Sequence, residues 1–260
     1  MNRIDKKFIE LKQKNKKAFI GFITAGDPTL EDTAALVHAL EEAGTDIIEI
    51  GIPYSDPLAD GPVIQLANQR AFMNADLSVA NIMAKVGFIR KTTEVPLLYL
   101  VYINTIIVYG KEKFMKDCVD AGIDGLIIPD MPLEEREELM VLINETDLAL
   151  IPLVAPTSKD RISKIVDGCK GFVYCVSSLG VTGRSSQFHE GIEAYLKDVK
   201  SKTNLPIAVG FGISNKKDIN ALSDLVDGVI VGSAIVQKVA EGKGDIEIVK
   251  NFIKELTVLS

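Results

Sequence analysis

Two carboxylate residues frame a short stretch of the sequence that could carry acid and base chemistry. Glu49 is the charged residue of the otherwise apolar run 47–51, and Asp60 lies near the end of the polar loop that follows. Side chains alternate along a strand, so Ile48 and Ile50 should point to one side and Glu49 to the other, on a buried face. Burial raises the pKa of a carboxyl group, which suits a proton donor and acceptor near neutral pH.

The two acids are expected to differ in ionisation. Asp60 follows a polar loop and should remain ionised, whereas Glu49 should hold its proton more tightly. Two carboxyl groups with separated proton affinities are the arrangement that acid and base catalysis needs. This stretch alone is equally compatible with another interpretation, in which Glu49 pairs with a Lys or Arg and Asp60 only shapes a turn.

Length and composition indicate one globular domain over residues 1–260. The chain is 47% hydrophobic and 25% charged, enough for a full hydrophobic core. Its net charge of -7 argues against a nucleic-acid partner, which requires a basic surface. The sequence has no signal-peptide pattern and no apolar run of membrane-spanning length, so we expect a cytoplasmic protein with no membrane partner.

Strand-like and helix-like segments alternate along the chain, which is typical of a closed (β/α)8 barrel, the TIM barrel. An amphipathic helix within residues 2–17 precedes the first strand. The strands are expected at 18–24, 47–51, 97–102, 125–128, 149–154, 171–176, 207–210 and 228–231. Helices are expected at 30–43, 79–91, 110–121, 133–145, 160–166, 191–201 and 216–225, followed by further helices near the end.

Large apolar and aromatic residues gather at the carboxyl ends of these strands, where TIM barrels place their reactive groups. They could line a pocket for a flat ring, although most such residues are simply core layers. The residues are Phe22, Leu100, Tyr102, Leu153, Tyr174 and Phe211. The two tyrosines are less easily explained as core, because a buried phenol needs a hydrogen-bond partner.

Glycines after the last two strands predict a phosphate site. The stretches 210–212 (GFG) and 231–234 (VGSA) each end a strand, and the second opens a helix whose N-terminus favours an anion. The long polar segment 177–190 has the composition of a mobile lid, with Thr182 and Gly183 as candidate ligand contacts. A plain surface connection is the alternative for that segment.

Metal and Schiff-base chemistry are not favoured by the sequence. The histidines are His38 and His189, and Cys118, Cys169 and Cys175 lack the spacing of metal ligands. No strand end clearly offers the desolvated Lys that a Schiff-base aldolase needs. We therefore expect no metal site.

The stretch 49–61 resembles the signature of the tryptophan synthase alpha subunit family, E-x-G-x-P-x-S-D-P-x-A-D-G, without a gap. Further blocks resemble the family in the same order and extend the resemblance over nearly the whole chain. They are 19–28 (FIGFITAGDP), 129–132 (PDMP), 179–183 (LGVTG), 210–213 (GFGI) and 232–236 (GSAIV).

The resemblance implies a lyase that cleaves indole-3-glycerol phosphate to indole and glyceraldehyde 3-phosphate in a retro-aldol reaction of tryptophan biosynthesis. It implies that Glu49 protonates indole C3 and helps remove the side-chain hydroxyl proton, while Asp60 binds the indole N–H. Phe22, Leu100 and Phe211 would line the indole pocket beside Tyr174, and the phosphate would meet Gly183, Gly212, Gly232 and Ser233.

The resemblance also implies a partner, a beta subunit that carries pyridoxal phosphate and receives the indole in an alpha2beta2 heterotetramer. Pro53 and Asp56 would face that subunit, and this chain would need no cofactor of its own. Ser178 occupies a position where some relatives carry Arg, so an ion pair of the lid at this position is in doubt. The alternatives are an isomerase or epimerase of sugar phosphates, and a non-catalytic regulator of a beta-type subunit.

Overall fold

The computed structural model describes residues 1–176, 186–210, 212–222 and 224–257, without the side chains of 186–190. The predicted ligand contacts Thr182, Gly183 and Phe211, and the variable position Ser178, lie outside the described residues.

Parallel strands form one sheet in the described part of the chain. Its order is β5-β4-β3-β2-β1-β9-β8-β7-β6. The strands are β1 (Ala18–Thr24), β2 (Ile47–Gly51), β3 (Leu97–Leu100), β4 (Gly125–Ile127), β5 (Ala149–Leu150), β6 (Leu153–Val154), β7 (Val173–Val176), β8 (Ile207–Gly210) and β9 (Gly228–Val231). Apart from β5 and β6, each neighbouring pair of strands in the chain also lies side by side in the sheet, and β9 returns to β1.

The sheet closes into a barrel through the stretch that contains β5 and β6. Ile151 donates its N–H to the carbonyl of Leu126 on the β4 side, 2.9 Å away, and the carbonyl of Pro152 accepts from the N–H of Tyr174 on the β7 side, 2.9 Å away. The single strand predicted for 149–154 is therefore divided at Pro152, because proline has no N–H to donate to a ladder. The expected (β/α)8 barrel is confirmed, with its fifth strand interrupted.

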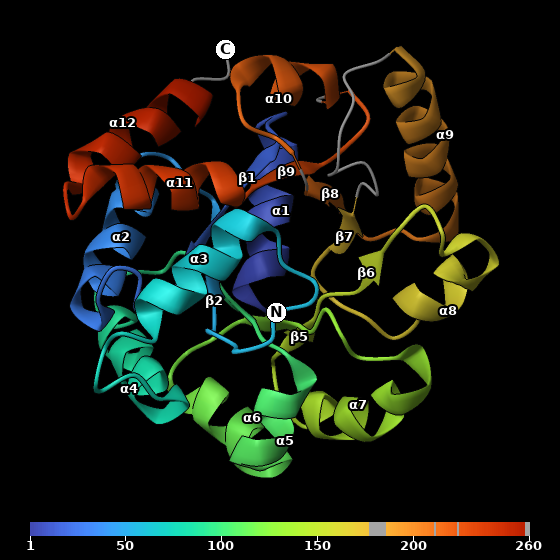
Figure 1. The fold of residues 1–260 in the computed structure, drawn as a ribbon. Helices are drawn as coiled ribbons and strands as arrows, with labels where there is room; N and C mark the ends of the chain where they lie inside the picture. The colour runs from blue at the N-terminus through green and yellow to red at the C-terminus, as the bar shows by residue number, and fades with distance from the viewer. Residues whose placement is uncertain (177–185, 211, 223, 258–260) are drawn as a thin grey trace.

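Helices surround the barrel and run mainly outside the strands (Figure 1). In chain order they are α2 (Leu30–Glu42), α3 (Pro62–Ala71), α4 (Val79–Ile89), α5 (Ile103–Tyr109), α6 (Lys111–Asp120), α7 (Arg136–Asn144), α8 (Ile162–Val166), α9 (Ser186–Lys202), α10 (Lys216–Leu222), α11 (Ser233–Gly242) and α12 (Ile246–Thr257), with 3-10 turns η1 (Leu133–Glu135) and η2 (Lys159–Arg161). No described helix is long and apolar enough to cross a bilayer.

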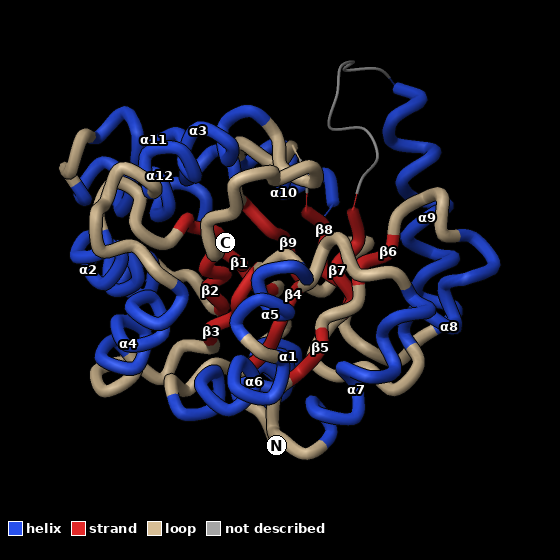
Figure 2. Tube along the Cα trace, turned by 60° about the horizontal axis from the view of Figure 1, so that its bottom comes forward, coloured by secondary structure: helices blue, strands red, loops and turns tan. Residues whose placement is uncertain are grey.

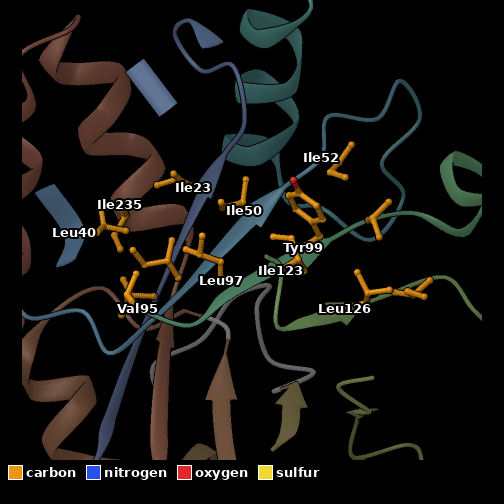
Figure 3. Close-up of a cluster of buried hydrophobic side chains, with 14 of the residues drawn as sticks. Ile23, Leu40, Ile50, Ile52, Val95, Leu97, Tyr99, Ile123, Leu126 and Ile235 are labelled. Carbon is orange, nitrogen blue, oxygen red and sulfur yellow. The ribbon is translucent and has the colours of Figure 1, made fainter. Parts of the chain in front are cut away.

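The larger apolar core lies between the strands and the outer helices. Ile50 of β2 and Tyr99 of β3 point into this layer, where Leu40 of α2 and Ile235 of α11 also lie (Figure 3). Burying one such side chain stabilises the fold by roughly 1.5 to 3 kcal/mol. This layer fixes the strands against their helices.

A second core fills the inside of the barrel and involves the first helix, α1 (Arg3–Gln13). Ile4, Phe8 and Leu11 lie on its buried face and pack with Ile20 of β1 and Phe172. Figure 2 shows α1 beneath the strands, on the side where the N-terminus lies. The amphipathic helix expected at the start of the chain therefore covers one end of the barrel and leaves the other end for the loops that follow the strands.

Two short helices were not expected from the sequence, α3 and α5. Helix α3 begins with Pro62 directly after Gly61, a favoured way to begin a helix, because proline at the first helical position loses no hydrogen bond. Both helices follow the carboxyl ends of neighbouring strands, β2 and β3. They therefore hold the loops on which Asp60 and Tyr102 lie.

Candidate active site at the carboxyl ends of the strands

Glu49 lies on the inner face of β2, as strand alternation predicted. Its side chain is 1% exposed, and both carboxyl oxygens lack a hydrogen-bond partner among the described residues. Burial raises its pKa from an ordinary value of 4.5 to about 8. The alternative in which Glu49 pairs with a Lys or Arg finds no support in the described residues, and the group is a protonated acid at neutral pH.

Asp60 lies at the edge of the same cavity and is only partly exposed. Burial raises its pKa from 3.8 to about 6, although hydrogen bonds from Tyr102 and Asn68 oppose this rise. The Nδ2 atom of Asn68 lies 3.5 Å from Oδ2 of Asp60. The polar loop thus does not leave Asp60 in open water, as its composition had suggested, but the carboxyl group still ionises below neutral pH.

Two glycines make room for the aromatic rings beside Glu49. A Cβ atom on Gly51 would lie 2.6 Å from the Phe22 ring, and one on Gly210 would collide with the Tyr174 hydroxyl. Phe22 is the β1 partner of Glu49, and Tyr174 lies close enough to Glu49 and Asp60 for their charges to help burial raise its pKa. Strand glycines here permit a close approach between ring and backbone.

A cavity of about 660 Å³ opens above these residues, within the size range of small-molecule sites. Glu49 and Asp60 line it together with Phe22, Leu100, Leu153 and Tyr174. The described lining contains no Lys or Arg. At neutral pH the described lining therefore offers one neutral carboxyl group, Glu49, and one ionised carboxylate, Asp60.

One side of the cavity is formed by backbone suited to an anion. Gly212, Gly232 and Ser233 line it, and Gly212 has a φ of +72°, which favours glycine. Helix α11 begins at Ser233, and Gly232 before it provides no side-chain cap. Uncapped N–H groups at a helix N-terminus bind phosphate well.

The remaining predicted residues lie elsewhere. Tyr102 does not line the cavity: its hydroxyl accepts a hydrogen bond from the N–H of Ala59, 3.0 Å away. In the loop after β2, Pro53 is buried and Asp56 is exposed, so of these two only Asp56 is accessible to a partner.

Several residues around the cavity are not predicted from the sequence. Asn68 of α3 contacts Asp60, and Ser158, Ser214 and Gln237 add polar groups to the lining. Pro62 after Gly61 is the signal that could have revealed α3 and hence Asn68. Among the described residues, no group of three or more His, Cys, Asp or Glu side chains is arranged to hold a metal ion.

Comparison with known sequences identifies relatives over the full length of the chain. The family model described as tryptophan synthase alpha chain matches residues 8–258. A tryptophan synthase alpha chain of a Thermoanaerobacter species is 54% identical over 259 residues, covering 98% of both chains. One from Caldanaerobacter subterraneus is 51% identical over 258 residues, covering 99% of this chain and 98% of its own.

Solved structures agree with the fold. The tryptophan synthase alpha subunit of Legionella pneumophila superposes with a TM-score of 0.91 at 34% identity, covering 98% of this chain and 97% of its own. A chain of the Pyrococcus furiosus tryptophan synthase a2b2 complex superposes with a TM-score of 0.87 at 32% identity, covering 93% and 98%. Since barrel, sequence and the motif from Glu49 to Gly61 agree with one family, this chain belongs to the tryptophan synthase alpha chain family.

Proposed function

We propose that this chain is a carbon-carbon lyase that cleaves indole-3-glycerol phosphate to indole and glyceraldehyde 3-phosphate in tryptophan biosynthesis. The observation that carries the proposal is the Glu49 carboxyl group, which is buried, without a hydrogen-bond partner among the described residues, and in the wall of a cavity of about 660 Å³. Its pKa of about 8 keeps it protonated when substrate arrives at neutral pH. A proton donor is what the first step of this cleavage needs.

Glu49 would act twice in one turnover. It first gives its proton to C3 of the indole ring, which makes the ring a cationic electron acceptor. The resulting carboxylate then takes the proton of the side-chain hydroxyl next to C3. The oxygen electrons form the aldehyde, the carbon-carbon bond breaks, and its electron pair returns to the indole ring. Glu49 ends the cycle protonated, as it began.

Asp60 would stabilise the intermediate between these two steps. Protonation at C3 places positive charge on the ring nitrogen, and an ionised carboxylate that accepts the N–H hydrogen bond lowers the energy of this charge. Asp60 ionises above about pH 6, whereas Glu49 remains protonated up to about pH 8. The two groups thus hold the required protonation states together around neutral pH.

Substrate binding would divide between the two sides of the cavity. Phe22, Leu100 and Tyr174 provide apolar surface for the indole ring. Gly212, Gly232 and Ser233 would hold the phosphate through backbone N–H groups and the serine hydroxyl. Thr182, Gly183 and Phe211 are proposed as further contacts from the segments outside the described residues.

No cofactor takes part in the proposed step, since the protonated indole ring itself accepts the electron pair. We further propose that the indole passes to a tryptophan synthase beta subunit, which carries the pyridoxal phosphate, in an alpha2beta2 complex. Exposed apolar residues in the loop after β2 and on α5 support a partner: Leu58 is 85% exposed, Val108 is 78% exposed and Ile107 is 51% exposed. Asp56 adds an exposed charge to the same loop as Leu58.

The test is release of indole from indole-3-glycerol phosphate by the purified chain, alone and with a beta subunit from the same source. We expect slow release that rises strongly when the partner is added. Glu49→Gln should lose essentially all turnover, because an amide cannot donate and accept the proton in sequence. Calorimetry with the uncleaved substrate should show that this variant still binds it.

Two results would contradict the proposal. Near-normal turnover by Glu49→Gln would remove Glu49 from the mechanism. Binding of the phosphate ligand without any indole release, with or without the partner, would point to another sugar-phosphate reaction or to a regulatory role.

A further inference from the structure

Tyr102 lies outside the cavity but directly behind its acidic rim. It follows β3 at the N-terminal boundary of α5, and its side chain is only 3% exposed. The cavity lining includes Ala59 and Asp60 but not Tyr102. A role in contacting substrate therefore does not explain why this phenol is buried here.

The hydroxyl of Tyr102 is held between two groups at the end of the loop after β2. It accepts a hydrogen bond from the N–H of Ala59, 3.0 Å away, and it lies close enough to the carboxylate of Asp60 to lower the pKa of that group. Burial raises the pKa of Tyr102, so the phenol stays protonated and can direct its O–H toward Asp60 throughout the neutral range. The hydroxyl thus satisfies one backbone donor of the loop and lies beside the carboxylate of the next residue.

The ring of Tyr102 holds the same loop at a second point. It stacks on the ring of Tyr54 with a centroid distance of 4.7 Å and an interplanar angle of 15°. Tyr54 and Ala59 stand on either side of the exposed residues 55, 56 and 58. Contact at both points restrains the loop across its exposed part.

Asp60 is also restrained from the side of α3. Gln65 donates its side-chain N–H to the carbonyl of Asp60, 2.9 Å away, and Asn68 approaches the carboxylate itself. These contacts restrain the Asp60 carbonyl and one carboxyl oxygen. The preceding residue, Ala59, is restrained by Tyr102. A carboxylate that must meet a ring nitrogen requires orientation within about 0.5 Å.

We propose that Tyr102 is a positioning residue for Asp60: its hydroxyl and its stacked ring fix the loop so that the carboxylate faces the cavity and accepts the indole N–H. This inference rests on the proposed lyase function. It replaces the expectation that Tyr102 touches the substrate. Tyr102 also contacts the exposed loop after β2, where a partner would dock.

The experiment compares Tyr102→Phe with Tyr99→Phe. Both changes remove one phenol oxygen from β3 or the residues just after it, but the Tyr99 hydroxyl is buried in the outer core without a hydrogen-bond partner among the described residues. Tyr99→Phe therefore controls for the loss of a buried oxygen at this place in the fold. Denaturation midpoints of both variants identify any general loss of stability.

We expect Tyr102→Phe to lower kcat for indole release about tenfold with little change in KM, because it removes the hydroxyl that holds Ala59 and faces Asp60. The acid limb of kcat/KM should also move to higher pH by about one unit, since the phenol lowers the pKa of Asp60. Among the described residues, the other titratable groups around Asp60 and Tyr102 are Glu49, Tyr54, Tyr174 and Asp130, and both variants leave them in place.

Equal kcat values and acid limbs for the two variants would overturn the proposal. A lower kcat with an unshifted acid limb would overturn it as well, because a merely structural role predicts that pattern. The pKa of Asp60, measured by carbon NMR of the carboxyl group, separates this inference from the proposed function. If the wild-type protein releases no indole but the pKa of Asp60 is still raised in Tyr102→Phe, the proposed lyase function is refuted. The proposed influence of Tyr102 on Asp60 then still holds.

Discussion

At the scale of single residues, the acid at the centre of the site is costly for the fold. Glu49 is fully buried with no hydrogen-bond partner among the described residues, and its pKa is about 8 in the folded chain against 4.5 ordinarily. A raised carboxyl pKa means that the folded state binds the proton more tightly than the unfolded state. The contribution of Glu49 to the free energy of unfolding is therefore largest below about pH 4.5, and it falls as the pH rises toward 8.

This sign leads to a prediction for Glu49→Gln. The stability of the variant relative to wild type should increase with pH, by up to about 1.4 kcal/mol per pH unit between about pH 5 and 8, because Gln cannot ionise. Urea denaturation of both proteins at several pH values measures the difference, and all other titrating groups cancel in it. A difference that does not change with pH would mean that Glu49 is ionised or paired in the folded chain.

The same residue shows what the sequence could reveal about the site. Alternation along 47–51 was enough to predict a buried face for Glu49, because the period of a strand is local. The rise in the pKa of Asp60 and the contact of Tyr102 with Ala59 could not be predicted, since each depends on how a loop folds back against another strand end. The sequence indicates that Tyr102 lies near the end of a strand, but not in which direction its side chain points.

At the scale of elements, an ion pair between buried Asp27 and partly exposed Arg70 connects the loop after β1 to the end of α3. The guanidinium of Arg70 binds the Asp27 carboxylate through two hydrogen bonds of 2.7 Å, and Asp27 is 2% exposed. Asn74 adds hydrogen bonds from its side chain to the carbonyls of Gly26 and Pro28. These contacts fix α3, which presents Asn68 to Asp60.

We expect Arg70→Ala to destabilise the fold by about 3 kcal/mol, because it leaves the buried Asp27 carboxylate without its partner. Lys85→Ala is the matched control, since the partner of Lys85, Glu31, is 86% exposed and the pair should contribute under about 1 kcal/mol. Urea midpoints with a common slope measure both values. Equal losses of unfolding free energy in the two variants would mean that burial of Asp27 does not determine how much the ion pair contributes to stability.

Element prediction succeeded where the pattern was long or the strand was apolar throughout. The strands at 18–24, 47–51, 207–210 and 228–231 have the predicted bounds. Helices α3 and α5 were not predicted because neither has an amphipathic pattern: α3 buries the small or polar residues Ala67, Asn68 and Ala71, and α5 is mostly apolar. The fifth strand is divided at Pro152 because proline has no N–H to donate. The sequence shows this proline, but the range predicted for the strand ran through it.

At the scale of the whole molecule, the residues that stabilise the barrel and the residues that could carry out chemistry lie at opposite ends of it. The loops after the strands form the cavity, whereas α1 covers the other end. Asn2 fixes the beginning of that helix by donating to the carbonyls of Asp124 and Asp147, each 2.6 Å away. TIM barrels in general separate a catalytic face from a stabilising face.

This separation predicts the effect of Phe8→Ala. Phe8 is 6% exposed and packs on Phe172 with ring centroids 5.6 Å apart, so its truncation should cost about 3 to 4 kcal/mol through lost burial and a remaining cavity. Ile9→Ala on the same helix is the control: Ile9 is 46% exposed, and the change should cost well under about 1 kcal/mol. Indole release per folded molecule should stay within about twofold of wild type in both variants, because no residue of α1 lines the active-site cavity. A selective fall in kcat for folded Phe8→Ala would show instead that packing inside the barrel transmits strain from one end to the other.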